Sequence, residues 1–137
     1  MKLDPSAFVA DKDLLDALEP RSERVVCEED RILFRQGETP SGLYVLRAGS
    51  VTLDMTSHTG EPLLSVQVPV GALLGLPGFV AEQPYSLTAK AAKGTELGFV
   101  CREDFSALML SEPSLSLKVL SVLAAEVRSA RNAISES

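Results

Sequence analysis

The chain has 137 residues, which is the size of one domain. Hydrophobic residues make up 45% of it, but only 5% are aromatic and none is Trp, so aliphatic side chains must fill the core. The formal net charge of -6 disfavours direct binding of this chain to DNA or RNA and docking on an anionic membrane surface. The N-terminus carries acids where a signal peptide needs an apolar core, and no apolar run could span a bilayer, so we expect a cytoplasmic protein.

The sequence contains few of the residues that usually bind metals or act as nucleophiles and bases. The chain has two cysteines, Cys27 and Cys101, no CxxC motif and a single histidine, His58. These residues are too few for a Cys-based cluster or a structural zinc site, and one histidine gives no nucleophile–base–acid set. We therefore predict no metal, no cofactor and no enzyme. The cysteines are expected to be free thiols, with a disulfide between them as the alternative, and His58 is expected to be a solvated turn residue.

The first predicted element is a short amphipathic helix over Asp11–Leu18. Asp11 can cap its N-terminus, and Leu14, Leu15 and Leu18 share one face. Pro20 ends the helix. Residues 1–23 are therefore predicted to form an N-terminal helical segment.

Residues 24–101 read as short β-rich runs separated by turn residues, which is typical of a sandwich or small barrel. The runs LYVL and VTLDM, joined at Ala48-Gly49, are predicted to form one hairpin. Ser57, His58 and Thr59 would lie towards the tip of the next turn, together with Asp54. The predicted strands are RVVCEE, RILFRQ, GLYVLRA, SVTLDM, PLLSVQV, SLTAKAA and TELGFVC.

After Cys101 the hydrophobic period changes to that of a helix, so residues 102–137 are predicted to form two helices separated at Pro113. The first has an apolar face of Phe105, Leu108 and Met109. The second, longer helix carries two apolar stripes, one of which can pack on the β domain. The other, called the second stripe below, alternates by three and four residues and is predicted to meet a partner helix, with an intramolecular contact as the alternative. The first stripe is Leu115, Val119 and Val122; the second is Leu120, Leu123, Val127, Ala130 and Ile134.

The segment RILFRQGETPSGLYVLRAGSVTL resembles the first half of the cyclic-nucleotide-binding domain of CRP/FNR regulators, protein kinase A regulatory subunits and cyclic-nucleotide-gated channels. The resemblance implies a mainly β fold with flanking helices, a double-stranded β-helix (a jelly roll or β-roll) followed by a long C-terminal helix. Residues 1–137 would then be a single domain of this type. The resemblance rests on Phe34, Gly37, Leu43, Tyr44, Val45, Gly49 and Val51.

Residues 71–91 are similar to the phosphate-binding cassette of that family. Members that bind cAMP or cGMP use a Gly-Glu pair, whose Glu accepts a hydrogen bond from the ribose, and an Arg followed by a small residue, whose Arg pairs with the phosphate. In this sequence Leu76 falls where the Glu belongs and Tyr85 where the Arg belongs, while Pro77 has no N–H to donate. The cassette pocket would be formed by Gly75, Leu76, Pro77, Tyr85, Ser86 and Leu87.

The altered cassette predicts weak or absent nucleotide binding. A charge-assisted hydrogen bond contributes roughly 1.5–3 kcal/mol, so the loss of two such contacts should weaken binding by about a hundred-fold to ten-thousand-fold. We expect Leu76, Phe79 and Tyr85 to fill the former pocket. Two alternatives stay open: a different, less anionic ligand, or weak nucleotide binding through Ser86 and the remaining backbone N–H groups.

The sequence thus predicts a non-catalytic regulatory module that acts through dimerisation or protein interaction; the alternative is a small-ligand sensor. In CRP/FNR regulators the long helix dimerises and leads into a helix-turn-helix domain, and this chain ends at that helix. We expect a stand-alone module that does not bind nucleic acid itself. A parallel homodimer is predicted through Leu120, Leu123, Val127 and Ala130.

Overall fold

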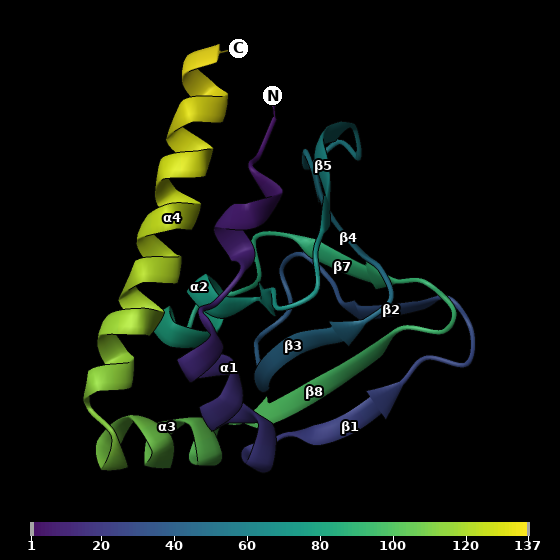
Figure 1. Cartoon of the computed structure of the whole chain (residues 1–137). Coiled ribbons are helices and arrows are strands. Elements are labelled where there is room, and N and C mark those ends of the chain that lie inside the picture. The colour runs from purple at the N-terminus through teal and green to yellow at the C-terminus, as the bar shows by residue number, and fades with distance from the viewer. Residues whose placement is uncertain (1, 137) are drawn as a thin grey trace.

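Two four-stranded antiparallel sheets form the β-roll, and helices cover one side of it (Figure 1). The computed structural model describes residues 2–136. The strands are β1 Glu23–Val26, β2 Arg31–Phe34, β3 Gly42–Ala48, β4 Val51–Thr56, β5 Pro62–Val68, β6 Leu73–Leu74, β7 Thr88–Ala91 and β8 Glu96–Cys101. The α-helices are α1 Lys12–Leu18, α2 Leu76–Ala81, α3 Arg102–Ser111 and α4 Ser114–Glu136, with short 3-10 helices η1 Pro5–Phe8 and η2 Glu19–Arg21.

The strand order is β1-β8-β3-β6 in one sheet and β2-β7-β4-β5 in the other. Apolar side chains from both sheets meet in one buried cluster, because inward-facing residues alternate along the strands. A second buried cluster lies between the roll and the helices, where Leu14 and Leu18 of α1 pack with Leu108 of α3. The predicted fold, a mainly β roll with flanking helices and a long C-terminal helix, is confirmed.

The predicted hairpin across Ala48-Gly49 is wrong. Strand β3 pairs with β6 and β8, whereas β4 pairs with β5 and β7, so the chain crosses from one sheet to the other at this point. Gly49 makes the crossing with φ of +94°, and a Cβ there would lie 2.6 Å from the Thr95 Cα. The buried Thr95 hydroxyl holds Ser50, the residue after Gly49. It accepts a hydrogen bond from the Ser50 N–H at 3.1 Å and donates one to the Ser50 carbonyl at 3.0 Å.

The true hairpin in this region is formed by β4 and β5. Ser57, His58 and Thr59 lie in its turn, as predicted. Asp54, by contrast, lies within β4, where its carboxylate is 3.3 Å from the Lys90 Nζ of β7.

The helices follow the predicted apolar periods closely. Asp11 caps α1 by accepting a hydrogen bond from the Leu14 N–H at 3.0 Å. Phe105 and Leu108 of α3 are buried, and so is the first stripe of α4. The second stripe is largely exposed on this chain, with exposed fractions of 57% for Leu120 and 54% for Val127.

The N-terminal segment, residues 2–10, lies between α4 and the roll (Figure 1). At one end the Asp4 N–H donates to the Ser129 hydroxyl of α4 at 2.7 Å. At the other end the Ala10 N–H donates to the Gly71 carbonyl at 3.1 Å, and Val9 forms an isolated bridge with Ala72. The segment therefore joins the long helix to the start of the cassette.

Candidate functional site

The cassette consists of β6, the short helix α2, a connecting loop and β7. Gly75 precedes α2 in a left-handed conformation with φ of +82°, a turn that favours glycine. A Cβ at Gly75 would lie 2.5 Å from the Tyr85 ring. The turn that opens the cassette is thus packed directly against an aromatic side chain.

Tyr85 occupies the interior of the roll. Its ring is 6% exposed and stacks on Phe34 with the ring centroids 3.8 Å apart and an interplanar angle of 15°. Two backbone hydrogen bonds hold the residue, from the Tyr85 N–H to the Glu38 carbonyl at 2.9 Å and from the Gly37 N–H to the Tyr85 carbonyl at 2.8 Å. Burial raises the pKa of Tyr85 to about 12, so the phenol is neutral and supplies no charge for a phosphate.

Beside Tyr85 a cavity of about 20 Å³ remains. This is space for about one water molecule. The space left beside Tyr85 in this conformation is therefore far smaller than a nucleotide. Of the six predicted pocket residues, five line this cavity: Gly75, Pro77, Tyr85, Ser86 and Leu87.

The sixth predicted residue, Leu76, is fully buried but does not line the cavity. It belongs to the cluster between the roll and the helices, as does Phe79. Phe79 meets Phe105 edge-on at 5.1 Å between ring centroids, and the Arg102 guanidinium lies 4.3 Å above its ring. Tyr85 therefore fills the roll interior, whereas Leu76 and Phe79 pack α2 against the cluster between the roll and the helices.

Glu126 of α4 is a site residue that the sequence analysis missed. It lines the small cavity beside Tyr85 and also a wider groove of about 240 Å³, called the α4 groove below. Its Oε2 is shielded from solvent and has no hydrogen-bond partner among the described residues. Burial raises the pKa of Glu126 to about 8. The sequence signal is its place four residues after Val122, in register with the buried first stripe of Leu115, Val119 and Val122.

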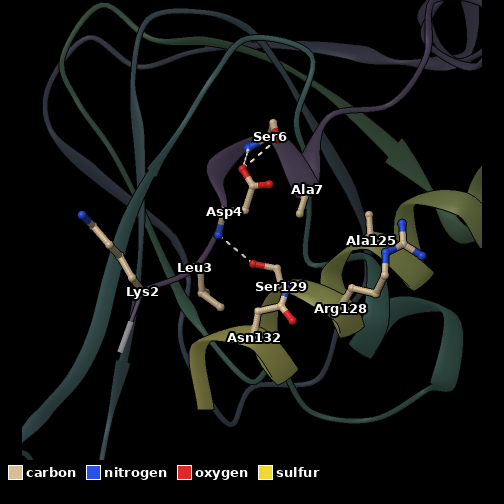
Figure 2. A pocket seen from close by; sticks show the side chains of 9 residues that line it. All are labelled: Lys2, Leu3, Asp4, Ser6, Ala7, Ala125, Arg128, Ser129 and Asn132. Atoms are coloured by element: carbon tan, nitrogen blue, oxygen red, sulfur yellow. Dashed lines mark hydrogen bonds between the residues drawn. The ribbon is translucent and has the colours of Figure 1, made fainter. Parts of the chain in front are cut away.

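A second hollow, of about 510 Å³, lies between the N-terminal segment and α4 (Figure 2). Figure 2 shows the Asp4–Ser129 hydrogen bond at its centre, and the Asp4 carboxylate accepts from the Ser6 N–H and hydroxyl at 3.0 and 2.7 Å. Lys2 and Arg128 also line the hollow. The Asp4 side chain here serves to cap η1.

Among residues 2–136, no group of three or more His, Cys, Asp and Glu side chains could hold a metal ion. None of the helices described is long and apolar enough to cross a membrane. Cys27 and Cys101 are free thiols, and Cys27 is buried.

Residues 24–112 match the model of the cyclic nucleotide-binding domain. The chain belongs to this family. It is a regulatory domain of the CRP/FNR type, and members of this type are transcriptional regulators rather than enzymes. Leu76 and Tyr85 lie within the matched residues.

The relatives are bacterial regulators. The transcriptional activator protein FnrA of Stutzerimonas stutzeri is 29% identical over 124 residues, which cover 90% of this chain and 49% of the relative. The cyclic AMP receptor protein of Thermus thermophilus is 29% identical over 108 residues, covering 79% and 50%. The crystal structure of the Thermus thermophilus catabolite activator protein superimposes with a TM-score of 0.80 at 25% identity, over 96% of this chain and 62% of that one. The chain spans about half the length of the curated relatives it matches.

Proposed function

We propose that this domain is a non-catalytic cytoplasmic regulatory module that does not bind cAMP or cGMP in the usual way and acts through a homodimer. The observation that carries the proposal is the stacking of Tyr85 on Phe34 inside the roll, 3.8 Å between ring centroids. A side chain that fills the interior replaces the ligand as the packing partner of the roll. The domain then keeps the family fold without needing a nucleotide to complete its core.

Charge supports the same proposal. The cassette position of the family Arg is held by the neutral phenol of Tyr85, and the position of the family Glu by the buried Leu76. The nearest acid lining the cavity is Glu126, which repels a phosphate when it is ionised. A nucleotide would therefore have to displace an aromatic ring and gain no cation in return.

Calorimetric titration with cAMP tests this part of the proposal. Because two charge-assisted contacts are absent, we expect no binding to the wild-type chain below about 100 μM. Tyr85→Arg should improve affinity by roughly tenfold or more, since it removes the ring and returns one such contact. Tyr85→Leu, which removes the ring and adds no cation, is the matched control and should bind more weakly than Tyr85→Arg. Low-micromolar binding by the wild type would overturn the proposal.

The second stripe supports dimerisation. Leu120, Val127 and Ile134 have exposed fractions of 57%, 54% and 63% and lie seven residues apart, which is the repeat of a helix-pair seam. Large aliphatic side chains exposed in a row along one helix are typical of an interaction surface. We infer that a second copy of this chain covers the stripe; a different protein partner is the other occupant that the test below distinguishes.

Sedimentation velocity over a range of protein concentrations tests the dimer. The double variant Leu123→Glu with Val127→Glu should sediment as a folded monomer, because four carboxylates would meet in the seam of the dimer. The control places the same two charges on exposed polar positions of α4, Ser121→Glu with Asn132→Glu, and should remain a dimer. A wild type that is monomeric at high micromolar concentration would exclude the homodimer and favour a protein partner.

A further inference from the structure

The α4 groove lies between the long helix, the N-terminal segment, the β4–β5 hairpin and the cassette, from which Pro77, Ser86 and Leu87 line it. Its volume is about 240 Å³. The walls are mainly apolar and come from distant parts of the chain: Phe8, Met55, Leu64 and Leu87 line it together with α4. A groove of this size can enclose the apolar body of a small molecule.

Glu126 gives the groove its one acidic group. The carboxyl lies among apolar side chains, and its Oε2 accepts no hydrogen bond from any described residue. A shielded carboxyl oxygen without a donor is unfavourable, and native proteins pair nearly all such atoms. Glu126 therefore has an unmet requirement for a hydrogen-bond donor, and the groove gives a ligand access to it.

None of the described groups around Glu126 supplies a cation to its carboxyl. Tyr85 is the other titratable residue lining the inner cavity, and its raised pKa, about 12, keeps it neutral. Among the residues described around the groove and the inner cavity there is no Lys, Arg or His. Lys2 and Arg128 face the separate hollow of Figure 2. A cation for Glu126 must come from outside the groove walls.

We propose that the α4 groove binds a small organic cation, an aliphatic or aromatic amine or guanidine, whose apolar body lies between α4 and the β4–β5 hairpin and whose N–H groups donate to Glu126. Charge complementarity selects this class. Once Glu126 gives up its proton it can pair with a cation, whereas an anionic ligand finds no group of opposite charge in the groove and meets a chain of net charge -6. All the lining residues come from one chain, but Leu123, Val127 and Ala130 belong to the second stripe, so a ligand here would lie beside the seam of the proposed dimer.

Cation binding to Glu126 releases a proton. Burial raises the pKa of this carboxyl to about 8, so at pH 7 most molecules carry it protonated. An ammonium group enters already charged, and the carboxyl transfers its proton to the buffer as the ion pair forms. Proton release therefore distinguishes binding at Glu126 from binding to an exposed, already ionised carboxylate.

Hexylammonium is the probe, titrated calorimetrically at pH 7 into the full chain in two buffers of different ionisation enthalpy. We expect a Kd of about 1 mM or tighter for a ligand of this size, with close to one proton released. Hexanoate has the same length and the opposite charge, and it should bind at least tenfold more weakly. Equal binding of the two ions, no binding of hexylammonium at millimolar concentration, or binding without proton release would overturn the proposal.

Glu126→Gln should weaken hexylammonium binding at least tenfold and abolish proton release, because an amide keeps the size and loses the charge. Glu112→Gln removes the same charge from an exposed position and should leave binding unchanged. If Glu126→Gln does not fold, the ratio between hexylammonium and hexanoate on the wild type still decides the question. A wild type that excludes the probe while Glu126→Gln alters sedimentation would identify the second copy as the occupant and overturn the small-ligand proposal.

Discussion

Replacing Glu126 with Gln should make the stability of the domain less sensitive to pH. The Glu126 carboxyl has an ordinary pKa of 4.5 in the unfolded chain and about 8 in the folded one, because burial disfavours its charged form. Between those two pH values the folded chain keeps a proton that the unfolded chain releases. The free energy of unfolding therefore falls as the pH rises through this window, and below it the contribution is absent.

The size of the effect follows from the same two pKa values. A rise from 4.5 to about 8 is roughly 3.5 pH units, and each unit corresponds to about 1.36 kcal/mol. The full difference is thus at most about 5 kcal/mol, and about 3 kcal/mol of it is expected between pH 5 and pH 8. For a domain of this size such a change is a large part of the total stability.

Urea unfolding followed by circular dichroism, at several pH values and one fixed protein concentration, measures this effect. The variant and the wild type should differ least at pH 5, and the variant should gain about 3 kcal/mol relative to the wild type by pH 8. Glu112→Gln controls for the loss of one negative charge at an exposed site. A difference between variant and wild type that stays constant from pH 5 to pH 8 would show that the Glu126 carboxyl is well solvated, and the reasoning from its burial would fail.

Three further changes test the packing that positions the site. Gly49→Ala should lower the free energy of unfolding by more than about 1 kcal/mol, because φ is +94° and the new Cβ would meet Thr95; an unchanged urea midpoint would contradict this. Thr95→Val should destabilise by about 1–3 kcal/mol, since it leaves the Ser50 N–H and carbonyl without the hydroxyl; faster hydrogen exchange at the Ser50 amide is the local readout. Tyr85→Ala should lower stability by roughly 3–5 kcal/mol through loss of its contact with Phe34, and a thermal midpoint within a degree of the wild type would argue against a filled interior.

Local sequence patterns were sufficient for the helices and for most strands. The cap at Asp11 and the buried face of α3 depend on residues close in the chain, so spacing alone predicts them. Which strands β3 and β4 pair with depends on contacts between residues far apart in the sequence, and residue spacing does not reveal those contacts. Ala48-Gly49 has the composition of a hairpin turn, but its conformation is decided by Thr95, which is far away in the sequence.

The candidate site was predictable as a segment but not as an arrangement of side chains. The resemblance to the family cassette predicts Leu76 and Tyr85 in one pocket. In the structure Tyr85 lies in the cluster inside the roll and Leu76 in the cluster between the roll and the helices. Glu126 lies in register with the first stripe of α4, so its direction towards the roll follows from the helical period. Its burial also depends on Phe8 and on the β4–β5 hairpin, which are far away in the sequence, and no periodicity encodes those contacts.

The N-terminal segment gives α4 a mechanical connection to the cassette. A displacement of α4 along its own axis must either break the Asp4–Ser129 hydrogen bond or pull residues 4–10 with it. The same stretch of chain is hydrogen-bonded to Gly71 and bridged to Ala72, just ahead of the glycine that opens α2. Force applied at the second stripe can thus reach the start of the cassette along the backbone. This route follows the backbone of residues 4–10, so it needs no ligand inside the roll, where the Phe8 and Tyr85 side chains share one buried cluster.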